Sequence, residues 1–176
     1  MRDRAVGTLL VYYGLRRSDV AFLKIESINW EESTISITQQ KTEVPLKLPL
    51  LPVAGNALFD YLTKERRKSD CPYVFLSLNR PYNAIGVSGI NGITDKIFNL
   101  ACIRMDEGDH RGTHIFRHHF ATSFLENNVA QPVISKLMGH LDPKSVETYL
   151  SADFTHLQEC AVSIEDYPMP VEVFVL

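Results

Sequence analysis

Two different hydrophobic patterns follow one another along residues 1–50 of the chain. Apolar side chains first recur three and four positions apart, at Val6, Leu9, Leu10 and Tyr13. This period predicts an amphipathic helix over residues 3–13 that ends near Gly14, and Ser18 is placed to cap a short second helix. From residue 33 to residue 50 apolar and polar residues alternate instead, which predicts a β-hairpin with QKTE near its turn. Prolines in the second strand indicate that it lies at a sheet edge.

Helical patterns dominate the rest of the chain. We expect a helix over residues 54–68 that ends in the basic run KERRK, and a strand over residues 73–77 followed by a loop to about residue 90. A further helix is marked by the apolar positions Ile93, Ile97, Leu100 and Ala101. The patterns therefore predict one domain that is mainly α-helical with a small antiparallel β-sheet, an α+β fold.

The segment GTHIFRHHFATSF, residues 112–124, places cationic and apolar side chains on one predicted helix. Thr113 is a suitable N-cap, so His114 and Arg117 fall in the first turn. Three phenylalanines share one stripe at about 100° per residue, and they are Phe116, Phe120 and Phe124. While this stripe fixes the helix, His114 and Arg117 project together beside unpaired backbone N–H groups, which predicts an anion site.

A second motif follows in QPVISKLMGHLDPKSVETYLS, residues 131–151. Pro132 suits the first position of a helix that packs through apolar residues and ends at Gly139, directly before His140. An Asp-Pro pair then opens a helix of about two turns that carries Tyr149. Since so short a helix is only marginally stable by itself, we expect Tyr149 to be mobile.

Charge and cysteine content restrict the class of protein. The formal net charge is −3, yet all 18 Lys and Arg lie within residues 1–144, while residues 145–176 carry six acids and no Lys or Arg. A mildly basic body is thus joined to an acidic tail. The first twenty residues have neither a membrane-spanning run nor a signal-peptide cleavage site. With three irregularly spaced cysteines, this favours a cytoplasmic protein with reduced, buried thiols and no membrane role.

Five motifs carry a resemblance to a known family: GLRRSDV (14–20), QQKT (39–42), HIFRHHFAT (114–122), LMGH (137–140) and ETY (147–149). Their order and spacing resemble the catalytic domain of the tyrosine recombinases, the phage integrase family, over roughly residues 3–152. The resemblance implies the fold of that domain and a site-specific recombinase or integrase that cuts and rejoins DNA. The residues that match the family's catalytic set are Arg16, Lys41, His114, Arg117, His140 and Tyr149.

The resemblance also implies a role for each residue. Tyr149 would attack a DNA phosphodiester to form a 3′-phosphotyrosyl ester, a reaction that requires no metal or nucleotide cofactor. His114 would act as general base, and His140 would donate a hydrogen bond to a phosphate oxygen. Two arginines, Arg16 and Arg117, suit the negative charge of the transition state. Lys41 on the hairpin would protonate the leaving 5′ oxygen.

Several alternatives stay open at this point. His110, His114 and His118 could line one helix face as metal ligands, although the predicted cap at Thr113 interrupts that helix. His118 is a candidate contact to the DNA backbone, and KERRK (64–68) is either a solvated helix end or a phosphate contact. The chain could also be a DNA-binding regulator that has lost catalysis, or a monomeric relaxing enzyme similar to type IB topoisomerases.

The resemblance implies partners and a domain division as well. We expect double-stranded DNA as the partner, with assembly of the full-length protein into a tetramer on two duplexes. Residues 1–152 would form the catalytic domain, and residues 153–176 an acidic tail. For this tail a contact with a neighbouring protomer is favoured, and folding back on its own core or disorder are the alternatives. The N-terminal clamp domain usual in the family is expected to be absent. Because phosphate contacts dominate affinity, DNA binding should then be weak and strongly salt-dependent.

Overall fold

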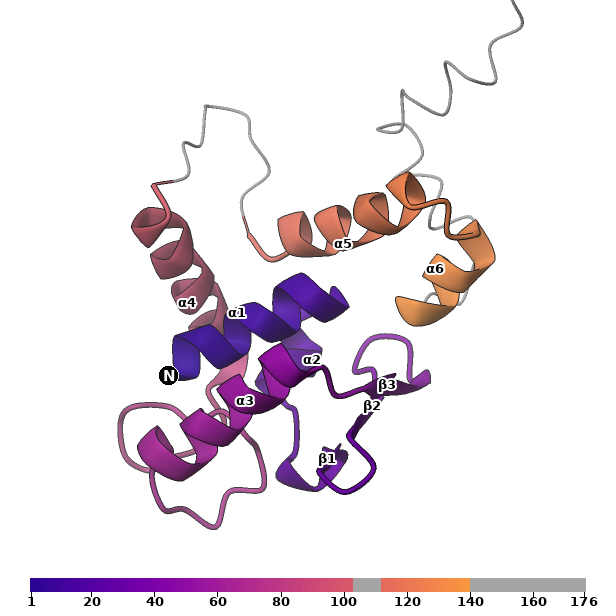
Figure 1. Ribbon diagram of the computed structural model, residues 1–176. Helices are drawn as coiled ribbons and strands as arrows, with labels where there is room; N and C mark the ends of the chain where they lie inside the picture. The colour runs from indigo at the N-terminus through magenta and orange to yellow at the C-terminus, as the bar shows by residue number, and fades with distance from the viewer. Residues whose placement is uncertain (103–111, 140–176) are drawn as a thin grey trace, which may run out of the picture.

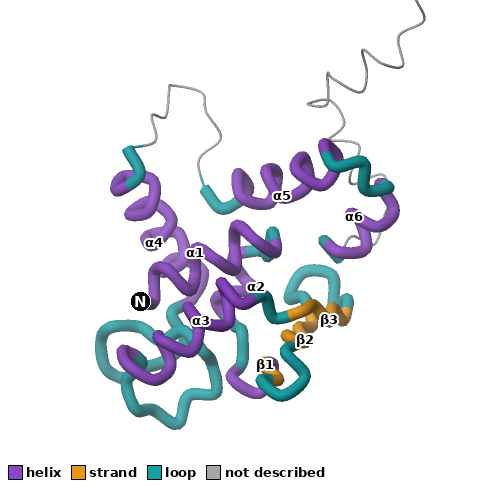
Figure 2. Tube along the Cα trace, viewed as in Figure 1, coloured by secondary structure: helices purple, strands orange, loops and turns teal. Residues whose placement is uncertain are grey.

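The computed structural model describes residues 1–102 and 112–139 of the chain. Its elements in chain order are α1 (Arg2–Tyr13), α2 (Arg17–Ala21), the 3₁₀-helix η1 (Ile25–Ser27), β1 (Ile28–Asn29), β2 (Thr34–Thr38), β3 (Pro45–Pro49), α3 (Pro52–Asp60), the π-helix η2 (Tyr61–Glu65), α4 (Gly86–Leu100), α5 (His114–Glu126) and α6 (Gln131–Leu137). Helices make up most of the described residues, beside one small sheet (Figure 2). The predicted fold class is confirmed.

Helix α1 is the centre of the helical layer, because it contacts α2, α3, α4 and α5 (Figure 1). Its inward face is fully buried and consists of Ala5, Val6, Leu9, Leu10 and Tyr13. The helical period predicted four of these positions, Val6, Leu9, Leu10 and Tyr13. The helix ends at Gly14 in the left-handed conformation, as expected. The hydroxyl of Tyr13 donates to the carbonyl of Pro49 at 2.9 Å and accepts from the N–H of Leu51 at 2.8 Å, which joins α1 to the sheet and to α3.

The sheet has three antiparallel strands in the order β1-β2-β3. Ile35 pairs with Leu48 and Ile37 with Leu46, so the apolar side chains of both strands face the core. The proline-bearing strand β3 lies at the edge, as predicted. The two-residue strand β1 was not predicted, because two residues are too few to display an alternating pattern.

Helices α5 and α6 form a second, smaller core with each other. Phe120, Ala121, Leu125, Ile134 and Met138 are its buried residues. Phe120 and Phe124 contact within this core, with ring centroids 4.7 Å apart, while Phe116 stacks on Phe98 of α4 at 5.3 Å. The predicted phenylalanine stripe therefore fixes α5 against two neighbouring elements. On α6, Ile134 is buried but Val133 is half exposed.

Several local predictions are wrong. Helix α2 begins at Arg17 with Arg16 as its N-cap, so Ser18 lies inside the helix and does not cap it. The run 73–77 forms no regular strand; it makes only isolated bridges, at Tyr73 and Leu76, while its apolar residues are buried. Helix α4 begins at Gly86, earlier than expected, and its last residue Leu100 is exposed. Of the cysteines in the described residues, Cys71 is partly exposed and Cys102 exposed, so they are not the buried thiols expected.

The predicted helix over residues 54–68 ends early, at Glu65, because the chain turns back at Arg66. Helix α3 passes into η2, which ends at Glu65, and Arg66 has an extended backbone. Its guanidinium donates to the carbonyls of Cys71, Tyr73 and Val74. Arg66 therefore has a structural role in holding the returning chain, whereas Arg67 and Lys68 are exposed.

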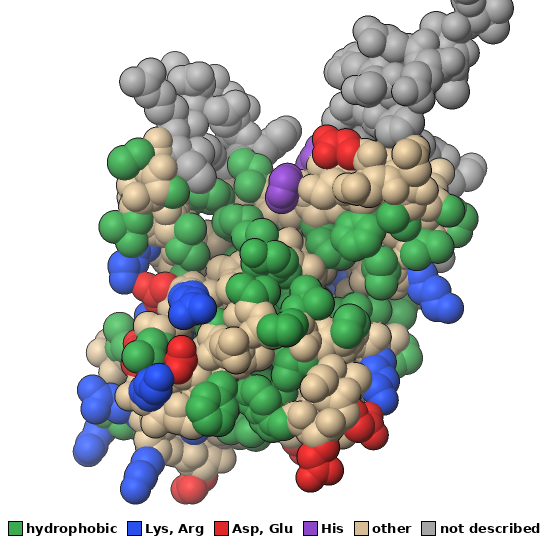
Figure 3. Space-filling view, viewed as in Figure 1, with side chains coloured by type: hydrophobic (Ala, Val, Ile, Leu, Met, Phe, Trp, Pro, Cys, Tyr) green, Lys and Arg blue, Asp and Glu red, His purple; other side chains and the backbone are tan. Residues whose placement is uncertain are grey.

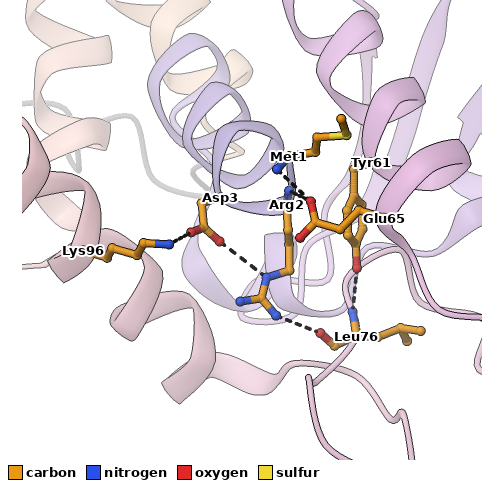
Figure 4. A network of polar contacts seen from close by, with 7 residues as sticks. All are labelled: Met1, Arg2, Asp3, Tyr61, Glu65, Leu76 and Lys96. Atoms are coloured by element: carbon orange, nitrogen blue, oxygen red, sulfur yellow. Dashed lines mark hydrogen bonds and ion pairs between the residues drawn. The ribbon is translucent and has the colours of Figure 1, made fainter.

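Polar contacts attach the start of α1 to two other elements (Figure 4). The carboxylate of Asp3 accepts a hydrogen bond from Lys96 of α4 at 2.6 Å, and Glu65 of η2 accepts from the backbone N–H of Arg2 at 2.9 Å. The guanidinium of Arg2 donates to the carbonyl of Leu76 at 3.3 Å.

No helix in residues 1–102 and 112–139 is long and apolar enough to cross a membrane.

Candidate active site

A pocket of about 350 Å³ lies where the α1–α2 junction, the β2–β3 turn and the start of α5 meet. It is lined by Leu15, Arg16, Arg17, Ser18, Lys41, Val87, Thr113, His114 and Arg117. Four of these are Arg or Lys, and none of the described lining residues is Asp or Glu. Four of the six predicted catalytic residues thus meet in one pocket whose charge favours an anion.

Arg16 reaches the pocket from the N-terminus of α2. Gly14 ends α1 in a left-handed turn, and the chain re-enters a helix at Arg17, so Arg16 lies in the sharp bend between the two helices. Its side chain is half buried, and its Nη1 donates to the amide oxygen Oε1 of Gln39 at 2.6 Å. A neutral amide therefore orients this guanidinium while leaving its positive charge for a ligand.

Arg117 is the most buried cation of the pocket, with a relative exposure of 4%. The Phe stripe of α5 carries it inward, and its nitrogens donate to backbone carbonyls, Nη1 to Gly14 and Nη2 to Met138, both at 2.6 Å. Burial of a guanidinium is tolerated because these bonds replace hydration. Arg117 therefore ties the end of α1 to the end of α6 and faces the same pocket as Arg16.

Of the four predicted residues in the pocket, His114 and Lys41 are exposed. His114 is the first residue of α5, with Thr113 as N-cap position as predicted, although the Thr113 side chain makes no capping hydrogen bond. The first turn of a helix carries partial positive charge, and here it lies beside the pocket. Lys41 lies in the turn between β2 and β3, where its side chain is solvated and reaches the pocket rim. Figure 3 shows histidine side chains of α5 at the molecular surface.

Two predicted catalytic residues, His140 and Tyr149, lie outside the described residues, as does His110 of the metal hypothesis. The described chain ends one position before His140, at Gly139, which has φ +62°. This left-handed residue follows α6 in the way the sequence predicted. Within the described ranges, no group of three or more His, Cys, Asp and Glu is placed to hold a metal ion.

Gln39 belongs to this site but was not among the residues predicted from the sequence. Its side chain is buried, with a relative exposure of 1%, and it contacts Arg16, Thr42 and Met138. A signal was present, because Ile35, Ile37 and Gln39 share the inward phase of one strand pattern. A polar residue at an inward position requires hydrogen-bond partners, and here the partners belong to the pocket.

Asp19 of α2 holds the hairpin against that helix. It is buried, and its Oδ1 accepts from the backbone N–H of Gln40 at 2.9 Å. The turn that carries Lys41 is therefore attached on both sides, to α2 through Asp19 and to the end of α6 through Gln39.

Fold and pocket together define a helical domain that presents clustered arginines, a lysine and a histidine to an anion. The chain matches the model of the phage integrase family over residues 1–156. It is 31% identical over 169 residues to the putative integrase/recombinase y4gC of Sinorhizobium fredii, covering 93% of this chain and 83% of that protein. It is 30% identical over 164 residues to tyrosine recombinase XerA of Pyrococcus furiosus, covering 90% of this chain and 53% of that protein. The chain belongs to the phage integrase family, and these relatives are named as integrases and tyrosine recombinases.

Solved structures confirm the fold. A crystal structure of XerA recombinase matches with a TM-score of 0.73 at 23% identity, over 92% of this chain and 59% of that one. The XerH site-specific recombinase, in a post-cleavage complex with its difH substrate, matches with a TM-score of 0.72 at 22% identity, over 90% of this chain and 44% of that one. The chain thus spans about half the length of the XerA and XerH recombinases, although it spans most of y4gC.

Proposed function

We propose that this chain is the catalytic domain of a tyrosine-type site-specific DNA recombinase, with Tyr149 as nucleophile. The observation that carries the proposal is the convergence of Arg16, Lys41, His114 and Arg117 on one pocket. These residues come from three segments that are distant in sequence, and they are the residue types that transesterification at a phosphodiester requires. Family membership supports the same reaction class.

The proposed step conserves the energy of the broken bond. The phenolic oxygen of Tyr149 attacks phosphorus, its proton passes to His114, and the bond from phosphorus to the 5′ oxygen breaks. The departing 5′ oxygen takes a proton from Lys41. Arg16 and Arg117, with His140, bind the nonbridging oxygens, where negative charge gathers in the five-coordinate transition state. Reversal with a 5′-hydroxyl from another strand exchanges the strands.

Duplex DNA is the proposed substrate, since XerH and the Tn1549 transposon integrase are both solved in complex with DNA. Residues 1–152 would form the catalytic unit, and residues 153–176 would contact a neighbouring protomer. Assembly into a tetramer on two duplexes is proposed for the full-length protein, because strand exchange needs four strands to be cut and joined in pairs.

Covalent trapping tests the proposal. The protein is incubated without metal with nicked duplexes from DNA flanking its own gene, and denaturant-resistant protein–DNA adducts are measured. We expect an adduct that Tyr149→Phe abolishes. Lys41→Ala should reduce its formation at least 100-fold, since loss of a general acid costs about 10²–10⁴ in rate. Lys47→Ala is the matched control, because Lys47 is an exposed lysine of the same hairpin that pairs with Glu32 at 2.9 Å, away from the pocket.

Each other outcome points to a different function. DNA binding without any adduct, in the wild-type protein, would indicate a catalytically silent DNA-binding regulator. An adduct accompanied by relaxation of supercoils but no joining of two sites would indicate a type IB topoisomerase-like enzyme. An adduct that survives Tyr149→Phe would overturn the assignment of the nucleophile.

A further inference from the structure

The buried amide of Gln39 connects the parts of the pocket that act on the phosphate. Its Oε1 accepts from Nη1 of Arg16 at 2.6 Å and from the hydroxyl of Thr42 at 2.8 Å. Its Nε2 donates to the carbonyl of Met138 at 3.0 Å, across 99 positions of sequence. One side chain thus spans α2, the β2–β3 turn and the end of α6.

The carbonyl of Met138 extends this connection to the second arginine. It accepts from Nη2 of Arg117 at 2.6 Å as well as from Gln39. The guanidiniums of Arg16 and Arg117 are therefore linked through one amide and one backbone carbonyl. The Thr42 hydroxyl also lies 3.4 Å from the carbonyl oxygen of Gly139, the residue before His140.

From these contacts we propose that Gln39 is a positioning residue of the recombinase: it sets the Arg16 guanidinium for the phosphate and fixes it relative to Arg117. The catalytic part of this inference rests on the proposed function. Gln39 does not touch the reacting atoms; it acts through Arg16. The same amide holds the β2–β3 turn through Thr42. Loss of the Gln39 amide should therefore affect Lys41 less than it affects Arg16.

The chemistry of the site favours an amide over other side chains. The position needs an acceptor at one end, for Arg16 and Thr42, and a donor at the other, for Met138. Glutamate would lack the donor, and its negative charge would neutralise Arg16 and weaken the attraction for a phosphate. Gln39 orients Arg16 without this loss. The fit is close, because a Cβ on Gly139 would overlap the Gln39 amide.

Gln39→Met tests the proposal, because methionine is unbranched and of similar length but makes none of the three hydrogen bonds of the glutamine amide. Gln40→Met is the matched control, since Gln40 is the adjacent glutamine and its side chain is exposed. Both variants are first compared by thermal unfolding, and both are expected to be folded. At saturating protein, Gln39→Met should slow single-turnover adduct formation about 10- to 100-fold, less than the roughly 10²–10³-fold lost when a preorganised donor is itself removed, because Arg16 is still present. Gln40→Met should leave the rate within twofold of the wild type.

Two modified substrates distinguish positioning of Arg16 from a general structural defect. A methylphosphonate replaces one nonbridging oxygen and removes the charge that Arg16 binds, so the Gln39→Met and Arg16→Ala defects should both shrink at least tenfold on it. A 5′-bridging phosphorothiolate has a leaving group that needs no proton, so it should rescue Lys41→Ala but not Gln39→Met. A Gln39→Met defect of equal size on all three substrates, or no defect, would overturn the proposal.

A measurement on the free protein separates this inference from the proposed function. In the side-chain ¹⁵N spectrum of arginine-labelled protein, the bond to Gln39 should slow rotation of the Arg16 guanidinium and give resolved Nη signals. These signals should average in Gln39→Met and persist in Gln40→Met. Unchanged Arg16 signals in Gln39→Met would refute the positioning role whether or not the wild type forms an adduct. Absence of any wild-type adduct, with the expected spectra, would count against the proposed reaction alone.

Discussion

Arg16 and Arg117 line the same pocket but are held in different ways. Arg16 is half buried and its guanidinium is oriented by one side-chain amide, whereas Arg117 is buried and donates to two backbone carbonyls. Removal of Arg117 would take a buried donor from the carbonyls of Gly14 and Met138, of which Met138 would keep Gln39 as a donor. Arg117 therefore serves the packing of the domain as well as the pocket, and Arg16 serves mainly the pocket.

This difference predicts different effects of truncation on stability. Arg117→Ala should lower the free energy of unfolding by about 1–3 kcal/mol, the usual cost of leaving buried polar groups unsatisfied. Arg16→Ala should change it by less than about 1 kcal/mol, since Thr42 still donates to Gln39. Urea unfolding of both variants, followed by circular dichroism, measures the two values. Equal losses would show that Arg117 has no structural role beyond that of Arg16.

At the scale of elements, Gly14 decides how closely α5 approaches α1. Its φ of +56° ends α1, and a Cβ at this position would lie 2.9 Å from the Phe120 ring of α5. A glycine is therefore required twice, for the backbone conformation and for the helix contact. The same close approach lets Arg117 reach the Gly14 carbonyl, so the helix packing and the pocket depend on one residue.

Two glycine variants separate these requirements. Gly14→Ala should cost about 2–4 kcal/mol of stability, combining left-handed backbone strain with overpacking against Phe120. Gly86→Ala has the same kind of strain, at φ +70°, but nothing lies within 4 Å of the added Cβ. It should therefore cost only about 1–2 kcal/mol. Chemical unfolding of the two variants measures the contrast, and a Gly14→Ala cost no larger than that of Gly86→Ala would contradict the packing argument.

Elements with a long periodic pattern were predictable, and elements fixed by distant partners were not. The α1 period, the β2–β3 alternation and the α5 phenylalanine stripe each report burial of one face, so their positions followed from the sequence. Ser18 failed as a cap because the sharp turn after Gly14 lets α2 begin at Arg17. The run 73–77 is buried like a strand, but its neighbours offer only isolated bridges.

The same distinction holds for the site. Local motifs indicated Arg16, Lys41, His114 and Arg117, and the family match confirms the recognition from which they were taken. Gln39 was missed because its role depends on Met138, a contact between residues 99 positions apart. The strand pattern indicated only that a polar residue faces inward at this position. It did not indicate which residue is its hydrogen-bond partner.

At the scale of the whole molecule, the pocket exists only where separate segments meet. The α1–α2 junction, the β2–β3 turn and the start of α5 each contribute side chains, and the end of α6 contributes the Met138 carbonyl. The geometry of the pocket is thus coupled to how α1 packs against its neighbours. The contacts at the opposite end of α1, at Asp3 and Arg2, hold that helix to α4 and η2 (Figure 4).

Asp3 makes this attachment dependent on pH. Burial raises the pKa of the Asp3 carboxyl, but the hydrogen bond and charge of Lys96, together with Arg2, outweigh it and hold the pKa below its ordinary value of 3.8. A carboxyl whose pKa is lowered by folding stabilises the fold above its unfolded pKa, and this stability is lost as the pH falls through the folded pKa. The contribution is therefore complete at pH 7 and disappears below about pH 4.

Asp3→Asn should consequently be less stable than the wild type at pH 7, by no more than about 1 kcal/mol because solvent screens the pair. The difference should shrink between pH 5 and pH 3, as protonation removes the same interaction from the wild-type protein. Urea unfolding at pH 7, 5, 4 and 3 measures it, with Asp95→Asn as control, since Asp95 is an exposed carboxylate of α4 beside Lys96. A difference that stays constant from pH 7 to pH 3 would show that Asp3 acts by packing, and that charge does not hold α1 to α4.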